Sequence, residues 1–210
     1  MSGVVAVLDY GIGNLRSAEK ALAHLGAPVV LTRDAGLIRD ASGVVLPGVG
    51  HFGACMRALH DAGLHDLAVE AAHSGRPFLG VCIGMQMLFE GSDEAPGVSG
   101  LAVLPGRVTR LPATVKLPQI GWNTIERVAS SALVAGLTDP AWLYFVHSYA
   151  PETDDDIVAA WAQHGRRFVA AVERANVWAT QFHPEKSGAA GLQLLGNFVA
   201  RCRADEAVTR

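Results

Sequence analysis

The sequence GVCIGMQ, residues 80–86, places a cysteine between two glycines that each lie two positions away from it. The preceding segment, RPFLGV, is typical of a short buried parallel strand, and the following IGMQMLFE is typical of the start of a helix. A strand, a sharp turn and a helix, with a reactive side chain at the turn, form the arrangement called a nucleophile elbow. Because glycine lacks a Cβ, Gly80 and Gly84 would let the strand and the helix pack closely behind that turn.

Cys82 is the predicted nucleophile of this chain. The N–H groups and the positive dipole end of the following helix would point at its sulfur, and both favour the thiolate, the form that attacks. The alternative interpretation is a buried, inert cysteine that packs as a small hydrophobic residue, which is common for free cysteines. We assign that interpretation to Cys55 and Cys202, which lie in apolar, helix-like patterns. At Cys82 the flanking glycines and the apolar strand favour a reactive thiol.

Composition narrows the possible classes of protein. The chain has 210 residues, half of them hydrophobic, and no long linker, so we expect a single domain over residues 1–210 with a sizeable core. A net charge of −3 provides no basic field for nucleic acid, and no apolar run is long enough for a membrane span. Three cysteines without framework spacing argue against a disulfide scaffold. Together with an N-terminal segment that does not resemble a signal peptide, they predict a cytoplasmic protein.

The sequence predicts neither a cofactor nor a metal. The histidines and cysteines are too scattered for the spacing of a zinc site. The GxGxxG fingerprint of dinucleotide-binding proteins and the phosphate-loop lysine motif do not occur, so a nucleotide cofactor is not supported.

The first half of the chain alternates between strand and helix patterns. Strands are predicted at residues 3–9, 28–32, 43–46 and 77–81, and helices at residues 14–25 and 52–72, the second with a break at Gly63. Such alternation predicts a parallel sheet with helices on both faces. In sheets of this kind, ligands bind at the carboxyl ends of the strands. The glycine-rich segments DYGIGN, PGVGHFG and GVCIGMQ all fall at such ends, so we expect one site there.

The second half of the chain has a different pattern. Between residues 101 and 172, short strand patterns alternate with turns, which predicts an antiparallel or mixed sheet. The segment VWATQFHPEKS follows, and an apolar stripe predicts a helix at residues 189–203. The predicted fold class is therefore α/β, with a mostly parallel, flavodoxin-like central sheet, helices on both of its faces and a small antiparallel sheet in addition.

A cysteine nucleophile needs a base, and His183 is the best placed of the eight histidines. It follows the apolar strand VWATQF, and Pro184 after it fixes the backbone. Positions i and i+2 of an extended segment point the same way, so Glu185 could accept a hydrogen bond from the imidazole Nδ1–H and leave Nε2 facing the sulfur. The alternative is a polar strand end with a solvent-exposed His and Glu. His51 and His147 also lie near strand ends and could line the site.

Acyl transfer also needs hydrogen-bond donors for an oxyanion. The N–H of Ile83, directly after the nucleophile, is one candidate. The segment PGVG, residues 47–50, ends the third predicted strand, and its glycines allow conformations that direct an N–H of Val49 or Gly50 inward. The same glycines permit a peptide to flip, so this oxyanion hole need not be formed at rest. The alternative interpretation is an ordinary loop.

Cys82 in GVCIGMQ, with FHPEKS about a hundred residues later, resembles the class I, or triad, glutamine amidotransferases. LDYGIGNLRS, PGVGHFG, IGWN, YFVHSYA and QFHPEKS occur in the order of one branch of that family, the glutaminase subunits of imidazole glycerol phosphate synthase. The resemblance covers nearly the whole chain. The pattern GxCxG is shared by many amidotransferases, whereas DYGxGN, PGVG and HPEKS together are much more specific.

This resemblance implies an activity and a set of residues. Cys82 would attack the side-chain amide of glutamine, and His183 would move the protons. Glu185 would orient the ring of His183. The ammonia would pass through a channel to a (β/α)8 cyclase subunit, the partner in a heterodimer, which makes imidazole glycerol phosphate and AICAR in histidine biosynthesis. By similarity, the residues that bind glutamine would be Gln86, Glu94, His147, Ser148 and Tyr149. The partner face would include Asn14, Trp122, Tyr144 and Lys186.

Three alternatives are open from the sequence. A glutaminase that serves another synthase is disfavoured by the DYGIGN and PGVG segments. A cysteine peptidase or a deglycase-like protein with the same elbow is disfavoured by FHPEKS at its distance from the cysteine. A non-catalytic binding module is disfavoured because Cys82, His183 and Glu185 are all present.

Overall fold

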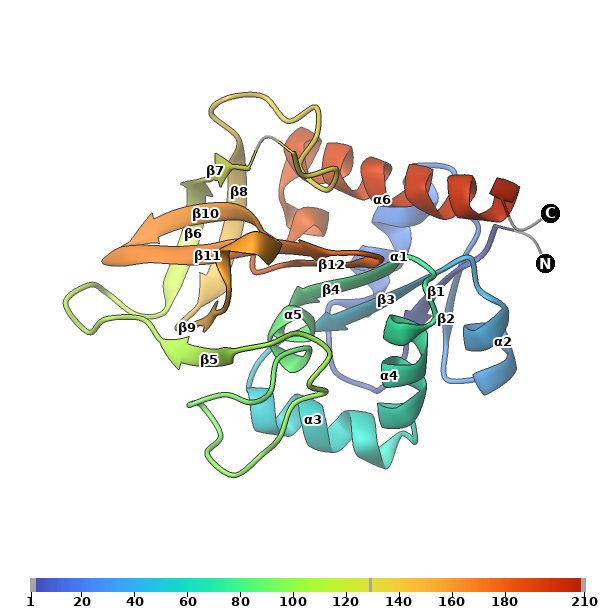
Figure 1. Cartoon of the computed structure of the whole chain (residues 1–210), viewed down its shortest axis with the longest axis horizontal. Coiled ribbons are helices and arrows are strands. Elements are labelled where there is room, and N and C mark those ends of the chain that lie inside the picture. The colour runs from blue at the N-terminus through green and yellow to red at the C-terminus, as the bar shows by residue number, and fades with distance from the viewer. Residues whose placement is uncertain (1–2, 129, 209–210) are drawn as a thin grey trace.

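An eight-stranded sheet forms the centre of the computed structural model, which describes residues 3–128 and 130–208 (Figure 1). In spatial order its strands are β2 (Val29–Thr32), β1 (Val5–Leu8), β3 (Gly43–Gly48), β4 (Phe78–Cys82), β12 (Val177–Thr180), β11 (Arg166–Arg174), β10 (Val158–His164) and β7 (Glu126–Arg127). The first five run parallel, and the last three continue the sheet antiparallel. The parallel part has the flavodoxin-like strand order, which confirms the predicted fold class.

Helices cover both faces of the parallel strands. On one face lie α1 (Leu15–His24) and α6 (Gly188–Val208), and on the other α3 (Phe52–Asp61), α4 (His65–His73) and α5 (Ile83–Met87), with α2 (Ala35–Asp40) beside α4 (Figure 1). Because both faces are covered, strands β1, β3 and β4 are buried along their whole length.

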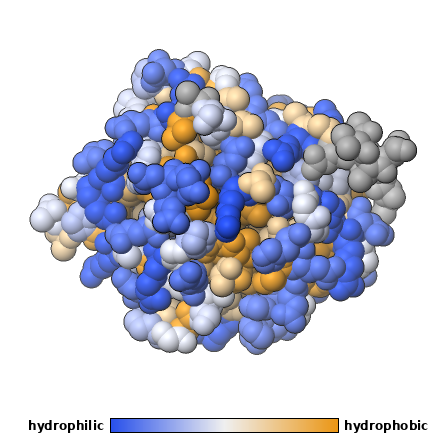
Figure 2. All heavy atoms as spheres, viewed as in Figure 1, coloured by the Kyte–Doolittle hydropathy of each residue, from blue (hydrophilic) through white to orange (hydrophobic). Residues whose placement is uncertain are grey.

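Figure 2 shows hydrophobic surface mainly near the middle of the molecule, with hydrophilic atoms around it. Within the described ranges, no helix has both the length and the apolar character needed to cross a membrane.

The second half of the chain forms several antiparallel parts rather than one small sheet. β10 and β11 form a hairpin that joins the central sheet through β12, and β7 pairs with β10. β5 (Arg107–Arg110) pairs with β9 (Tyr149–Glu152), and β6 (Gln119–Thr124) pairs with β8 (Trp142–His147), as two separate sheets. Single turns of 3-10 helix, η1 (Asp155–Ile157) and η2 (Pro184–Lys186), precede β10 and α6. An alternating pattern identifies a strand but not its partner, so this division could not be predicted.

The predicted elements of the first half are present, with two differences. The helix predicted at residues 52–72 divides as expected at Gly63. This glycine has a φ of +68° and lies between α3 and α4. The sequence pattern does not predict α2, because six residues are too few to establish a helical period. β3 continues beyond residue 46, since Pro47 and Gly48 still pair in parallel with Val81 and Cys82.

The turn at Cys82 depends on a close approach of α5 to β3. A Cβ on Gly84 would overlap the carbonyl oxygen of Leu46, and a Cβ on Gly48 would press against the backbone nitrogen of Gly84. A Cβ on Gly80 would meet the carbonyl group of Gly84 in the same way. Residues without a Cβ allow these backbone segments to touch, which is the role that the sequence predicts for the glycines around the cysteine.

Gly84→Ala is expected to destabilise the fold by about 3 kcal/mol or more, because the added methyl group has to displace α5 or the end of β3. Gly196→Ala is the matched control. Gly196 lies in α6 with no atom near the position of its missing Cβ, so alanine there should stabilise the protein by up to about 1 kcal/mol. Urea unfolding measures both changes, and a Gly84→Ala variant as stable as the unmodified chain would contradict the close approach.

Candidate active site

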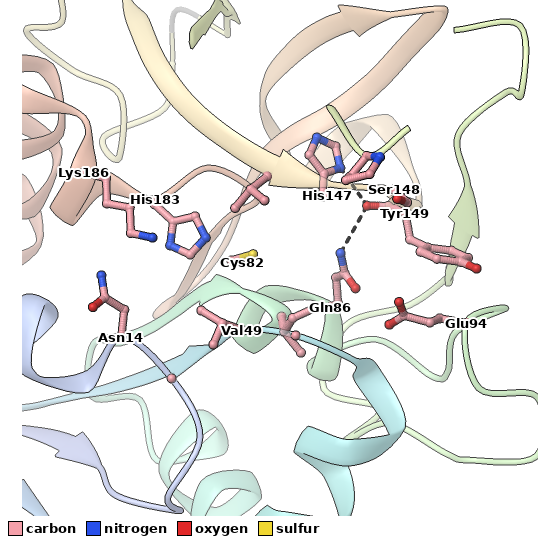
Figure 3. A pocket seen from close by; sticks show the side chains of 15 residues that line it. Asn14, Val49, Cys82, Gln86, Glu94, His147, Ser148, Tyr149, His183 and Lys186 are labelled. Atoms are coloured by element: carbon pink, nitrogen blue, oxygen red, sulfur yellow. Dashed lines mark hydrogen bonds between the residues drawn. The ribbon is translucent and has the colours of Figure 1, made fainter. Parts of the chain in front are cut away.

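A cavity of about 530 Å³ opens where the chain leaves the carboxyl ends of β1, β3, β4 and β12 (Figure 3). Its volume is typical of small-molecule sites. The predicted site residues that line it are Asn14, Val49, Gly50, Cys82, Ile83, Gln86, Glu94, His147, Ser148, Tyr149, His183 and Lys186. Glu185 contacts His183 from behind, whereas Trp122 and Tyr144 do not line the cavity. His51 does not line it either, since its side chain caps α3.

Cys82 ends β4 and precedes α5 in an unusual backbone conformation. Its φ is +57° and its ψ is −111°, a combination that residues other than glycine rarely adopt. Such strain persists only where the surrounding structure fixes it, here the pairing with Gly48 on one side and α5 on the other. The residue is 2% exposed and lines the cavity. The sharp turn predicted from GVCIGMQ is confirmed, although the helix after it has only five residues.

His183 follows β12 and is fixed by hydrogen bonds around β8. Its N–H donates to the carbonyl of Tyr144, and its carbonyl accepts from Ser187 Oγ, which also accepts from the N–H of Tyr144. Its Nδ1 lies 2.8 Å from Glu185 Oε1, so the predicted contact is present. The predicted reason for that contact is wrong. The backbone of Pro184–Lys186 forms the 3-10 turn η2, and the pair meets across this turn rather than along an extended strand.

His183 and Glu185 stabilise each other as an ion pair. Their side chains are only 1% and 3% exposed. Burial alone would lower the pKa of His183, but Cys82 and Glu185 outweigh it and raise the pKa to about 9. Burial also acts against the Glu185 carboxylate, yet the hydrogen bond and the charge of His183 hold the pKa of Glu185 below its usual range. His183 Nε2 has no hydrogen-bond partner of good geometry among the described residues, so this atom is left for the nearby sulfur or for a substrate.

Asn14 contacts the buried carboxylate rather than its own helix. It occupies the N-cap position of α1, but its side chain makes no capping hydrogen bond. Instead, its Nδ2 donates at 3.1 Å to Glu185 Oε1, the oxygen that also contacts His183. The glycine-rich segment after β1 is thereby connected to His183 through Glu185.

Two buried side chains hold the PGVG segment. The Tyr10 hydroxyl donates to the carbonyl of Pro47, and the Cys55 thiol donates to the carbonyl of Val49 at 3.2 Å. Burial raises the pKa of both groups, that of Cys55 to about 11, so both remain donors at neutral pH. A trans peptide places its N–H opposite its carbonyl, so the N–H of Gly50 points away from Cys55.

Gln86 presents an unpaired oxygen next to the cavity. Its amide nitrogen donates to the carbonyl of Tyr149 at 3.1 Å and to the side-chain oxygen of Gln181 at 3.0 Å. Its own Oε1 is buried and has no partner within the described part of the chain, which points to a ligand that carries an N–H donor. Gln181 was not predicted as a site residue from the sequence. The available signal was a glutamine inside the otherwise apolar segment VWATQF.

Glu94 is an acidic group on the same side of the cavity. One of its carboxylate oxygens accepts the N–H of Phe52 at 2.7 Å, at the start of α3. Figure 3 shows Gln86 and Glu94 on one side of Cys82, and His183 on the other. Among the described residues, no group of His, Cys, Asp or Glu side chains is arranged to hold a metal ion.

Trp122, Tyr144 and Lys186 form a row of side chains beside the cavity. Trp122 meets the Tyr144 ring edge-on with centroids 6.1 Å apart, and Lys186 Nζ lies 5.8 Å from the centroid of the Tyr144 ring. Ile120 and Trp122 lie two positions apart on β6, hence on the same face of the strand, and are 64% and 54% exposed. Large apolar side chains gathered on a surface in this way are typical of a site that binds another protein.

His147 is a second buried histidine, and its pKa moves in the opposite direction. Burial lowers its pKa to about 4, and the nearby His164 and His183 act in the same direction. Its Nδ1 lies 2.8 Å from the carbonyl of Tyr149, which can only accept, so the neutral ring carries its proton on Nδ1. Nε2 then has to accept, and the amide of Gln119, 3.1 Å away, has to turn its NH2 group toward the ring.

The chain belongs to the class-I glutamine amidotransferase family, whose model matches residues 6–202. The matched range includes all the site residues described above. The family resemblance predicted from the elbow and the HPEKS segment is therefore confirmed.

Similar chains place this protein within one branch of the family. It is 46% identical to the imidazole glycerol phosphate synthase subunit HisH of Methanothermobacter thermautotrophicus, over 96% of this chain and 100% of that one. It is 48% identical to the subunit of the same name from Streptomyces avermitilis, over 93% of this chain and 95% of that one. A crystal structure of a glutamine amidotransferase that is 22% identical covers 94% of this chain and 100% of its own, with a TM-score of 0.73, and supports the fold. The branch predicted from the sequence motifs is confirmed.

Acid is expected to destabilise the protein through His147. In the unfolded chain His147 has an ordinary pKa of 6.5, so it binds a proton at a higher pH there than in the folded chain. The stability that depends on a neutral His147 is therefore present above pH 6.5 and is lost as the pH falls through about 4. The loss approaches about 3 kcal/mol. His147→Gln should remove this part of the pH dependence, and His24→Gln, at an exposed position, should retain it. Urea unfolding at neutral pH and near pH 4 gives the comparison, and an equal loss in all three proteins would refute the assignment.

Proposed function

We propose that this chain is the glutaminase subunit of an imidazole glycerol phosphate synthase and hydrolyses L-glutamine to glutamate and ammonia. The observation that carries the proposal is the meeting of Cys82, His183 and Glu185 at one cavity. A cysteine, a base and an orienting carboxylate are the parts that thioester chemistry at an amide requires. The name of relatives at 46% and 48% identity supports this particular synthase. The chain would form one glutaminase domain and would act in the cytoplasm.

In the proposed reaction, Cys82 Sγ attacks the side-chain carboxamide carbon of glutamine. The C–N bond breaks as His183 Nε2 gives its proton to the departing ammonia, and a thioester remains on the sulfur. Water then attacks the thioester carbon while His183 takes a proton from it, the C–S bond breaks and glutamate leaves. Glu185 accepts the Nδ1–H hydrogen bond throughout and keeps Nε2 directed at the reacting atoms.

Backbone N–H groups would hold the oxyanion in each step. Ile83 begins α5 directly after the nucleophile, and Val49 and Gly50 line the same cavity. Tyr10 and Cys55 hold the carbonyls on either side of the peptide between residues 48 and 49, and that peptide has no side-chain partner in the described ranges. We infer that this peptide turns to complete the oxyanion hole when the partner is loaded, which would prevent the waste of glutamine.

Glutamine would lie with its headgroup against Glu94, whose carboxylate suits the α-ammonium group. The backbone of Ser148 and Tyr149 would hold the α-carboxylate. The unpaired Oε1 of Gln86 would accept an N–H of the substrate. His147 would support the site by holding the carbonyl of Tyr149 in place.

The ammonia would pass to a partner subunit, a (β/α)8 cyclase that makes imidazole glycerol phosphate and AICAR in histidine biosynthesis. Trp122, Tyr144 and Lys186, together with Asn14, would form the face on which the partner docks. Asn14 and Lys186 also line the cavity, so a partner docked there would cover its mouth and keep the ammonia from bulk water.

Cys82→Ala is expected to reduce glutamate release from glutamine by at least about 1,000-fold and to leave ammonia-dependent synthesis by the partner intact. The reason is that Cys82 acts only in the release of ammonia. The assay mixes the chain with the cyclase and its nucleotide substrate, supplies either glutamine or an ammonium salt, and quantifies glutamate and imidazole glycerol phosphate. Glutamate release by the variant at the unmodified rate would refute the nucleophile, and no imidazole glycerol phosphate from the unmodified pair with glutamine would refute the choice of synthase.

Trp122→Ala is expected to weaken the complex with the cyclase by about tenfold or more, because a large exposed aromatic residue is a typical interface anchor. Isothermal titration calorimetry measures the affinity. Glutamine-dependent synthesis should fall at low subunit concentration and recover at high concentration. Arg39→Ala is the control, since the Arg39–Glu70 ion pair lies on exposed surface between α2 and α4. Equal weakening by both substitutions would show that this face is not the docking surface.

A further inference from the structure

Gln181 is a buried polar residue just beyond the apolar strand β12. Its side chain has no exposed surface, and neither has that of Phe182 after it. The N–H of Gln181 donates to the carbonyl of Ala170 at 2.8 Å, so contact with β11 continues past Thr180 and fixes the backbone of Gln181. A side-chain amide this deeply buried has to find its hydrogen-bond partners within the protein.

One of those partners is the sulfur of Cys82. Gln181 Nε2 lies 3.8 Å from Sγ, within hydrogen-bond reach because sulfur has a larger radius than oxygen. The other end of the amide, Oε1, accepts from Gln86 Nε2 at 3.0 Å. Gln86 also donates to the carbonyl of Tyr149 at 3.1 Å. These contacts form one chain of hydrogen bonds from the backbone of β9 to the candidate nucleophile.

The carbonyl of Tyr149 fixes the direction of the hydrogen bonds in this chain. A carbonyl accepts and never donates, so the amide of Gln86 has to present its NH2 group. That nitrogen carries a second hydrogen, which requires an oxygen at the facing end of Gln181. The NH2 end of Gln181 is therefore the end that faces Sγ. A donor in this position stabilises a thiolate, whereas an oxygen there would repel it.

We propose that Gln181 is a catalytic residue that donates a hydrogen bond to the Cys82 thiolate, and that Gln86 sets the orientation of this donor. The proposal rests on Cys82 being the nucleophile of the proposed function. His183 is an acid that gives up its proton during the reaction, whereas the amide of Gln181 keeps its hydrogens. Gln181 therefore stabilises the sulfur anion before attack, and again when the C–S bond of the thioester breaks.

This role predicts a change that depends on pH. A donor to the thiolate increases the fraction of sulfur that is ionised and reduces the nucleophilicity of each ionised sulfur. Removal of the donor should therefore slow the reaction of Cys82 at neutral pH and leave its rate at high pH unchanged or faster. A merely structural role for Gln181 would lower the rate at every pH, so the two roles are distinguishable.

The test is Gln181→Met, which keeps an unbranched side chain of similar size and removes the amide. Iodoacetamide alkylates Cys82, and mass spectrometry of the Cys82 peptide gives the rate across the pH range. We expect the rate profile to move to higher pH by about one unit, with a loss of about tenfold at neutral pH and no loss at high pH. Glutamine hydrolysis in the complex with the cyclase should show a lower kcat and a nearly unchanged KM.

Two further variants make the outcome decisive. Thr180→Val removes the hydroxyl that donates to the carbonyl of Phe182, and should leave the alkylation profile in place. Gln86→Met frees the amide of Gln181, and should move the profile in the same direction by a smaller amount while it raises KM, since Gln86 lines the cavity. Gln86→Met also carries the test if Gln181→Met does not fold.

An unchanged profile in both glutamine variants, or an equal loss at every pH, overturns the proposal. An equal shift in Thr180→Val overturns it as well, because that variant keeps the amide. Failure of the proposed function gives a different result, namely glutamine hydrolysis by Cys82→Ala at the unmodified rate.

Discussion

The whole site depends on one close contact, the approach of α5 to β3 at Gly84. The backbone of the helix lies against the carbonyl of Leu46 with no space for a side chain between them. This contact leaves no room for a wider turn, so the chain has to change direction within Cys82, which takes a positive φ. The thiol is thereby placed at the edge of the sheet where strands β1, β3 and β12 also end. Gln181 and His183 meet the sulfur at this edge because the turn is this tight.

The cavity contains two buried histidines whose charges differ, and their partners explain the difference. Burial acts against the charged form of both rings. His183 lies between a carboxylate and a sulfur, which outweigh burial, whereas His147 lies between a carbonyl and an amide, which do not. A charged His147 would also be repelled by His183. The charged histidine is therefore the one beside Cys82, and the histidine on the side of Gln86 and Glu94 stays neutral.

The sequence patterns were sufficient for the strands of the parallel half of the fold and for Cys82, Ile83 and His183 at the cavity, because the signals for these are local. The glutamine-binding residues were predicted only from the family resemblance. Apolar runs mark buried strands, and paired glycines mark a turn with close backbone contact. What could not be predicted depends on packing between distant segments. A glutamine in an apolar strand does not reveal that Gln181 faces Cys82, and an asparagine before a helix does not reveal that Asn14 contacts Glu185. The pairing of β10 and β11 with the central sheet is of the same kind.

The backbone of Cys82 also affects how this position can change during evolution. Glycine adopts a φ of +57° easily, whereas a residue with a side chain does so at a cost of about 1–3 kcal/mol. Selection for folding alone would thus favour glycine here, and only selection for the chemistry of the thiol retains cysteine. If the thiol were no longer needed, glycine would be the more stable residue at position 82. The glycines around it would still be needed for the close backbone contacts. The strain at Cys82 is therefore a cost in folding stability that the thiol requires and the fold does not.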